Sequence, residues 1–179
     1  EFRRVLFRSG EGTEGFMAKG SFRTNGASPA PLHLVRADLR DGSVTLHEIC
    51  GAPMGIVANP PVVDESRSIA VGFDSANATM TAFDIHADGT TTIRWQREQG
   101  HGPHMVLYPD TGELVTHDHD LERMMEQVVV VDIETGAERG RVDTGSPLMA
   151  PVFPAPGFGR DLYSCAFPGI TRIAVEPED

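Results

Sequence analysis

The amino-acid sequence predicts an all-β protein, a partial β-propeller of about three to four four-stranded antiparallel blades. Three observations predict this fold. Short apolar runs of alternating polarity recur along the chain, a repeat of about 46 residues relates them, and turns rich in Asp, Gly and Pro separate them. Alternation with a period of two is typical of half-buried strands, and a repeat of this length is typical of propeller blades.

The composition narrows the class of protein. The chain has 179 residues, of which 40% are hydrophobic and 23% are charged, so it can bury a core. The formal net charge of -11 makes the chain acidic and leaves few basic side chains to neutralise phosphates. No apolar run is long enough for a transmembrane helix. We therefore expect no nucleic acid partner and no membrane span.

The first nine residues, EFRRVLFRS, resemble the peptide translated from a common sequencing-library adapter. We therefore interpret residues 1–9 as a non-native segment and residues 10–179 as the propeller domain. A genuine basic N-terminus is the alternative. On the adapter interpretation the natural N-terminus is missing together with any signal peptide, so the chain predicts no cellular compartment.

The repeat is clearest where an apolar run ends in an aspartate and a short turn closes on glycine. The three aspartates are separated by 46 and 48 residues. An aspartate at the start of a turn accepts hydrogen bonds from backbone amides two residues on, and glycine tolerates the positive φ that such turns require. The predicted pairs are Asp38 with Gly42, Asp84 with Gly89, and Asp132 with Gly136.

The predicted blades follow one another along the chain. The first contributes about three strands between residues 15 and 50, and two complete blades cover about 54–99 and 105–143. The last blade has three strands before the chain ends. Many propellers close their ring with a strand borrowed from the other end of the chain, so we interpret the C-terminus as natural and the N-terminus as cut. An open blade face at each end predicts association through these faces.

Three smaller features complete the pattern. The segment HDLERMMEQ around Leu121 is predicted to be one helical turn or a loop insertion. Cys50 and Cys165 are interpreted as two buried free thiols, with a disulfide as the alternative. Methionines that recur in register are expected to pack between blades as adaptable core residues. These are Met54, Met105 and Met149.

The unit VVVVDIETGAERGRV resembles repeats of the PQQ-like, quinoprotein alcohol dehydrogenase-like β-propeller superfamily. The resemblance covers roughly residues 15–179. It implies a fold shared by quinone-dependent dehydrogenases and by scaffold or assembly proteins that carry no cofactor. In the enzymes the repeat often has a tryptophan that docks neighbouring blades, and here Trp95 alone occupies a comparable place. Neither an adjacent cysteine pair nor a calcium-ligand cluster can be carried over, so PQQ itself is not expected.

The candidate site is a group of four histidines. Two lie in the loop that enters the innermost strand of a blade, and strand alternation places the other two on one face, opposite Asp118 and Asp120. Imidazole binds transition metals, and carboxylates complete such sites. Turn or strand-end histidines bonded to backbone carbonyls are the alternative. The candidate metal ligands are His101, His104, His117 and His119, of which His101 and His104 are also the catalytic candidates.

Two hypotheses about function follow. The first is a binding or scaffold propeller that takes a protein or small-molecule ligand at its channel face and favours basic or neutral partners. The second is a propeller oxidoreductase or transferase with a histidine site at the channel mouth, with a transition metal as the cofactor. No G-x-S-x-G, P-loop or dinucleotide motif is present. Convergence of His101, His104 and other polar groups would favour the second hypothesis.

Overall fold

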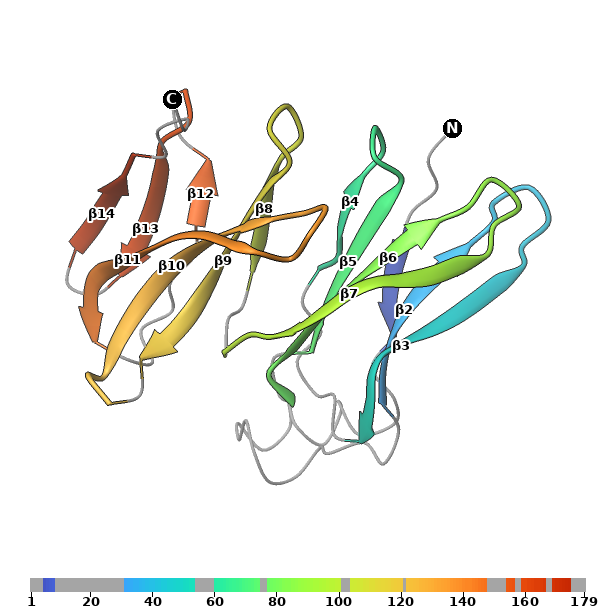
Figure 1. Cartoon of the computed structure of the whole chain (residues 1–179), viewed down its shortest axis with the longest axis horizontal. Coiled ribbons are helices and arrows are strands. Elements are labelled where there is room, and N and C mark those ends of the chain that lie inside the picture. Colours follow the sequence, from blue (N-terminus) through green and yellow to red (C-terminus); the bar gives the residue numbers. More distant parts are fainter. Residues whose placement is uncertain are drawn as a thin grey trace. The chain divides into compact units, whose positions relative to one another are not determined.

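The computed structural model describes residues 5–8, 31–53, 60–74, 77–100, 104–120, 122–147, 154–156, 159–166 and 169–174. These residues form strands joined by turns (Figure 1). None of the described segments is a helix that is long and apolar enough to cross a membrane. The chain divides into two units, residues 1–99 with 134–136 and residues 100–133 with 137–179.

The first unit contains two antiparallel sheets. The first sheet has the order β1-β2-β3 and the second sheet the order β4-β5-β6-β7, so consecutive strands are hairpin neighbours. The strands of the first sheet are β1 (Val5–Arg8), β2 (Pro31–Ala37) and β3 (Val44–Pro53). Those of the second sheet are β4 (Val62–Asp64), β5 (Ile69–Asp74), β6 (Thr79–Ile85) and β7 (Thr91–Glu98).

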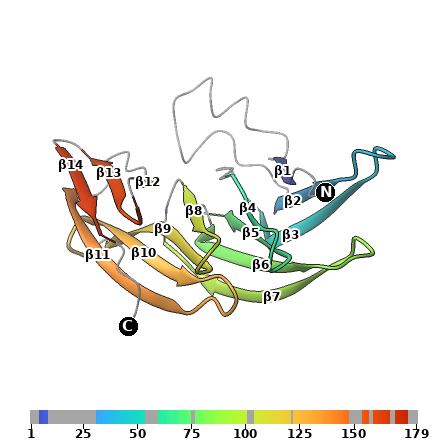
Figure 2. The same cartoon turned by 90° about the horizontal axis from the view of Figure 1, so that it is seen from above.

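The second unit also contains two antiparallel sheets. The third sheet has the order β8-β9-β10-β11 and the last sheet the order β12-β13-β14. The strands of the third sheet are β8 (Met105–Tyr108), β9 (Glu113–Asp120), β10 (Met125–Asp132) and β11 (Glu138–Pro147). Those of the last sheet are β12 (Pro154–Pro156), β13 (Leu162–Ala166) and β14 (Gly169–Ile173). Figure 2 shows β7 and β11 as the long outer strands of their own sheets.

The described chain is therefore all-β and forms a partial β-propeller of two four-stranded and two three-stranded blades, as predicted. Its turns have the predicted chemistry. Gly42, Gly89 and Gly136 have φ values of 74°, 88° and 73°, which lie in the region that only glycine adopts freely. Asp38 Oδ1 accepts the Arg40 amide at 2.8 Å, so its role in the turn is confirmed.

Each unit has its own small core between two sheets. In the first unit Leu34 of the first sheet packs with Ala70 and Phe83 of the second sheet. In the second unit Val115 and Val128 of the third sheet pack with Leu162 of the last sheet. All of these side chains are buried, and burial of apolar surface of this kind is what holds two sheets together.

Two features differ from expectation, and a third decides between two predicted alternatives. Residues 1–9 were left out of the predicted fold, whereas Val5–Arg8 form β1 and pair with β2. The free edge of β2 explains this, because backbone pairing requires an extended chain and no particular sequence. The blade predicted to end at about residue 143 is longer, because its fourth strand, β11, continues to Pro147. Of the two predicted alternatives for the segment HDLERMMEQ, the described residues agree with the loop, since residues 122–124 form a turn and Asp120 pairs with Met125 across the β9–β10 hairpin.

The sulfur-containing residues are described in part. Cys50 is a free, half-buried thiol, in line with the prediction of free cysteines. Met105 begins β8 and is half-buried. Met54, Met149 and the side chain of Cys165 lie outside the described residues.

Candidate functional site

The histidines of β9 lie in the second unit, on the face of the third sheet that also carries Val115. His117 pairs with Val128, and His119 pairs with Glu126 of β10. The Nε2 atom of His119 lies 2.7 Å from Oε2 of Glu126, whose side chain is buried. The prediction that both histidines share one face is therefore confirmed, and their face is the one packed toward the last sheet.

His117 occupies a position that is apolar in the preceding repeat. Its partner Val128 lies four residues before Asp132, and in the second sheet Phe73 pairs with Met80, four residues before Asp84. Both Phe73 and His117 are fully buried. Burial, followed by the nearby His119 and His104, lowers the pKa of His117 to about 4. His117 is therefore a neutral imidazole in the interior of the unit at physiological pH.

His104 lies at the start of β8 and is half-buried. Its backbone oxygen accepts a hydrogen bond from Thr116 Oγ1 at 3.3 Å, and burial lowers the pKa of its imidazole. His101 lies outside the described residues. Within the described part of the chain, no three His, Cys, Asp or Glu side chains are grouped so that they could hold a metal ion. The four-histidine metal site therefore stays a prediction.

A polar network covers the opposite face of the third sheet. Arg141 of β11 donates from Nη1 to Asp118 Oδ2 and to Gln127 Oε1, both at 2.7 Å, and from Nη2 to Glu138 at 2.8 Å. The hydrogen bonds that Arg141 donates, first to Glu138 and then to Asp118, raise the pKa of its guanidinium. The Gln127 amide also donates to Asp143 at 2.8 Å. Asp118 thus serves to tie β9, β10 and β11 together.

The sequence analysis missed Glu126 and Arg141. Both carry charge in strand segments that were interpreted only by their apolar alternation. The register of the β9–β10–β11 hairpins would have revealed the contacts of both residues. In this register Glu126 lies opposite His119. Gln127, which binds Arg141, lies opposite Asp118 on one side and Asp143 on the other. Cross-strand neighbours of this kind interact directly.

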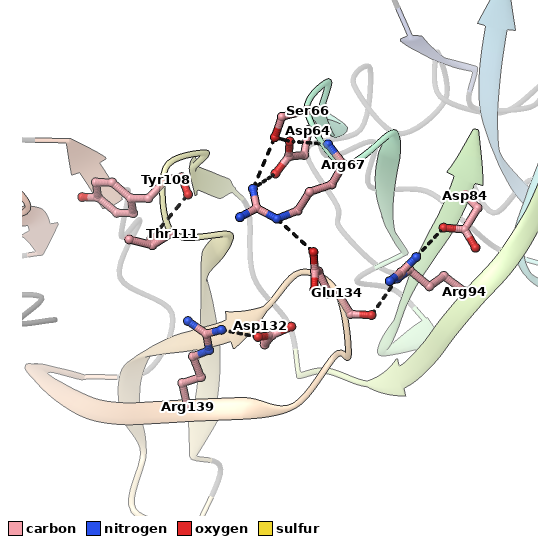
Figure 3. A network of polar contacts seen from close by, with 10 residues as sticks. All are labelled: Asp64, Ser66, Arg67, Asp84, Arg94, Tyr108, Thr111, Asp132, Glu134 and Arg139. Carbon is pink, nitrogen blue, oxygen red and sulfur yellow. Dashed lines mark hydrogen bonds and ion pairs between the residues drawn. The ribbon is translucent and has the colours of Figure 1, made fainter. Parts of the chain in front are cut away.

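The first unit has a second polar network around Arg67 and Arg94 (Figure 3). Arg67 donates to Asp64 at 2.8 Å and to Glu134 at 3.2 Å. Arg94 donates to Asp84 and to the backbone oxygen of Glu134, each at 2.7 Å. These contacts hold the turn at Glu134 against the second sheet. Asp84 forms an ion pair with Arg94 across its own hairpin. The equivalent residue of the second unit, Asp132, forms an ion pair with Arg139.

A neighbouring contact explains the position of Trp95. A Cβ atom added to Gly136 would lie 2.7 Å from the Trp95 indole, so the ring lies directly over this turn glycine. Arg97 also donates to the Gly136 oxygen at 3.0 Å. The first and second sheets repeat the arginine contact, since Arg36 donates to the Gly89 oxygen at 2.8 Å. Trp95 therefore contacts a turn glycine within the first unit, and an arginine donates to the glycine oxygen at both turns.

One shallow, open pocket of about 350 Å³ lies in the first unit, at the ends of β6 and β7. It is lined by Asn77, Ala78, Thr79, Gln96, Arg97 and Glu98. Near it the buried carboxylate of Asp74 accepts the Asn77 amides at 3.1 and 2.8 Å and lies 3.5 Å from the Cys50 thiol. Burial is the main factor that raises the pKa of Cys50, so the thiol is not activated as a nucleophile.

Neither a family model nor a curated protein matches this chain. Solved structures do resemble it. A luciferin-regenerating enzyme has 18% sequence identity and a TM-score of 0.50, over 76% of this chain and 44% of that one. The β-propeller domain of the Trilobed protease from Pyrococcus furiosus has 8% identity and a TM-score of 0.45, over 95% of this chain and 52% of that one. The chain spans about half the length of these structures, and the likeness concerns the fold.

Proposed function

We propose that this chain is a binding and scaffold propeller of the PQQ-like repeat type, with residues 10–179 as the propeller domain and residues 1–9 derived from an adapter. The observation that carries this proposal is the use of the candidate polar side chains. His119 is engaged by Glu126, and Asp118 by Arg141. His117 is buried in the interior of its unit. Side chains bound to one another in this way stabilise a blade and leave few groups to carry out chemistry on a substrate.

The turn between β10 and β11 supports the assignment to PQQ-like repeats. The resemblance implies a tryptophan that docks neighbouring blades, and Trp95 lies over Gly136 in such a position. The aspartate that precedes this turn, Asp132, is held by Arg139. These contacts give the tryptophan and the aspartate of the repeat pattern each a physical role within its own unit.

Charge indicates the kind of partner. The chain carries 26 acidic and 15 basic residues. At the β9–β10 end of the third sheet, Glu122 is exposed and forms no ion pair among those of the described residues, whereas the neighbouring Asp120 is paired with Arg123. An acidic surface attracts cationic partners over a distance of about one Debye length. The partner that fits this surface best is therefore a basic peptide segment.

Calorimetric titration with a lysine-rich peptide tests this proposal. We expect saturable binding that weakens several-fold between 50 and 300 mM NaCl, because salt screens exposed charges. Glu122→Gln should weaken the binding, whereas the matched change Glu65→Gln in the β4–β5 turn should not. Equal binding of a glutamate-rich control peptide would refute the proposed charge preference.

Metal analysis separates this proposal from the oxidoreductase or transferase alternative. Zn²⁺ or Co²⁺ is titrated into the wild-type chain and into His104→Ala, with the fold of both checked by circular dichroism. The scaffold proposal expects identical titrations. One equivalent of tightly bound metal that is lost in His104→Ala would instead establish a histidine metal site and favour the enzyme.

A further inference from the structure

The connection between β5 and β6 carries the tripeptide Asn77-Ala78-Thr79. An asparagine followed two residues on by serine or threonine, with any residue except proline between them, is the acceptor pattern for N-linked glycosylation. The other asparagines of the chain, Asn25 and Asn59, are followed at that position by alanine and proline. Asn77 is therefore the asparagine whose sequence context fits this modification.

The tripeptide lies at an accessible place in the first unit. Its three residues are half-buried, and they line the shallow, open pocket together with Gln96, Arg97 and Glu98. An oligosaccharide attached to Asn77 would therefore extend into open space. Its first sugar would meet amide, guanidinium and carboxylate groups, all of which form hydrogen bonds with hydroxyls.

The backbone of this turn keeps the threonine hydroxyl beside the asparagine. Ala78 adopts a positive φ of 49°, which bends the chain sharply between its two neighbours. Thr79 Oγ1 then donates a hydrogen bond to the backbone oxygen of Asn77 at 2.9 Å. The two functional groups of the acceptor pattern thus belong to one compact turn.

The side-chain amide of Asn77 is held by a contact that a sugar leaves intact. Its Nδ2 atom donates to Oδ2 of the buried Asp74 at 2.8 Å, and its backbone amide donates to Oδ1 of the same carboxylate at 3.1 Å. A carboxamide nitrogen carries two hydrogens, whereas the bond to Asp74 requires one. Because glycosylation replaces one hydrogen, the buried carboxylate keeps an amide donor in the modified chain.

We propose that Asn77 is an acceptor site for an N-linked oligosaccharide. The donor is an oligosaccharide carried on a polyprenyl pyrophosphate. Nδ2 attacks C1 of its first sugar, so that the C1–N bond forms, the C1–O bond breaks, the polyprenyl pyrophosphate leaves and Nδ2 gives up one proton. This modification concerns the first unit, whereas the peptide binding proposed above concerns the third sheet.

Translation of the full chain behind a cleavable signal peptide, in the presence of rough microsomes, tests the site. The protease-protected wild-type chain should carry a single glycan, seen as a mass shift that an endoglycosidase removes. Asn77→Gln should lose this shift completely. Thr79→Val should lose it as well, because valine keeps the branched shape and lacks the hydroxyl, whereas Thr79→Ser should retain it.

A matched site in the next turn verifies that the donor reaches the chain. Asp88→Asn, made in the Asn77→Gln background, places an asparagine two residues before Thr90 in the exposed β6–β7 turn, and this variant should be glycosylated. A protected wild-type chain without a glycan would overturn the proposal. A glycan that remains on Asn77→Gln or on Thr79→Val would overturn it too.

Discussion

His117 shows how one residue changes the physics of a position that recurs in two sheets of this chain. The second sheet fills this position with Phe73, which adds apolar burial, whereas the third sheet fills it with an equally buried imidazole. The neighbouring titratable groups are His104 directly before β8, His119 on β9 and Glu126 on β10. A buried imidazole resists protonation, since a charge is poorly solvated in the interior.

This difference predicts a pH dependence of stability. The pKa of His117 is about 4 in the folded chain and near the ordinary value of 6.5 in the unfolded chain, so the unfolded state binds the extra proton first. The free energy of unfolding should therefore fall as the pH drops from about 6.5 to 4, by up to about 3 kcal/mol. Urea unfolding between pH 7.5 and 4.5 measures this loss.

The variant His117→Phe should remove most of that part of the pH dependence, because it copies Phe73 of the preceding sheet. The matched variant His86→Phe changes an exposed histidine and should retain the wild-type slope. Carboxylates lose stabilising contacts over the same pH range in all three proteins, so only the difference between them is assigned to His117. Equal slopes for wild type and His117→Phe would contradict this account.

At the scale of the element, the turn at Gly136 contacts the second sheet within the first unit. Gly136 adopts a φ of 73°, receives a hydrogen bond from Arg97 and lies beneath Trp95. Gly42 has nearly the same φ of 74°, but a Cβ atom there would meet nothing within 4 Å. Alanine substitutions at the two turns therefore separate the free-energy cost of a left-handed backbone from the cost of a steric clash with a neighbouring side chain.

Gly42→Ala should lower the free energy of unfolding by about 1 kcal/mol, which is the cost of a left-handed conformation for alanine. Gly136→Ala should lower it by that amount and by a further 1–2 kcal/mol or so, because the new methyl group displaces the Trp95 ring. Denaturant unfolding of both variants measures the difference. In the background of Trp95→Ala the two substitutions should cost nearly the same amount, and a persistent gap would show that the indole is not the cause.

At the scale of the whole molecule, the charge balance controls association. Arginines neutralise many of the acidic side chains in the described sheets, among them Asp64, Asp84 and Asp132, and the chain still has a net charge of -11. The surface charge of the chain is therefore predominantly negative, which favours the cationic partner proposed above and predicts that added salt weakens binding of the lysine-rich peptide.

Much of the fold could be predicted because strand alternation and turn chemistry are local. The Asp–Gly hairpins at Asp38, Asp84 and Asp132 located the blades, and alternation along β9 placed His117 and His119 on one face. The pairing of Val5–Arg8 with β2 could not be predicted in this way, since an open edge accepts an extended segment whatever its side chains.

By itself, the sequence determined the repeat, the strand order and the turns, because each depends on residues close together along the chain. Only the tertiary structure decided which side chains meet. The partner of His119 is Glu126, and the ring of Trp95 lies on Gly136, two contacts that depend on hairpin register and on the packing of successive blades. The burial of His117 was decided in the same way, because a strand pattern gives the face of a residue and the neighbouring sheet determines whether that face meets water.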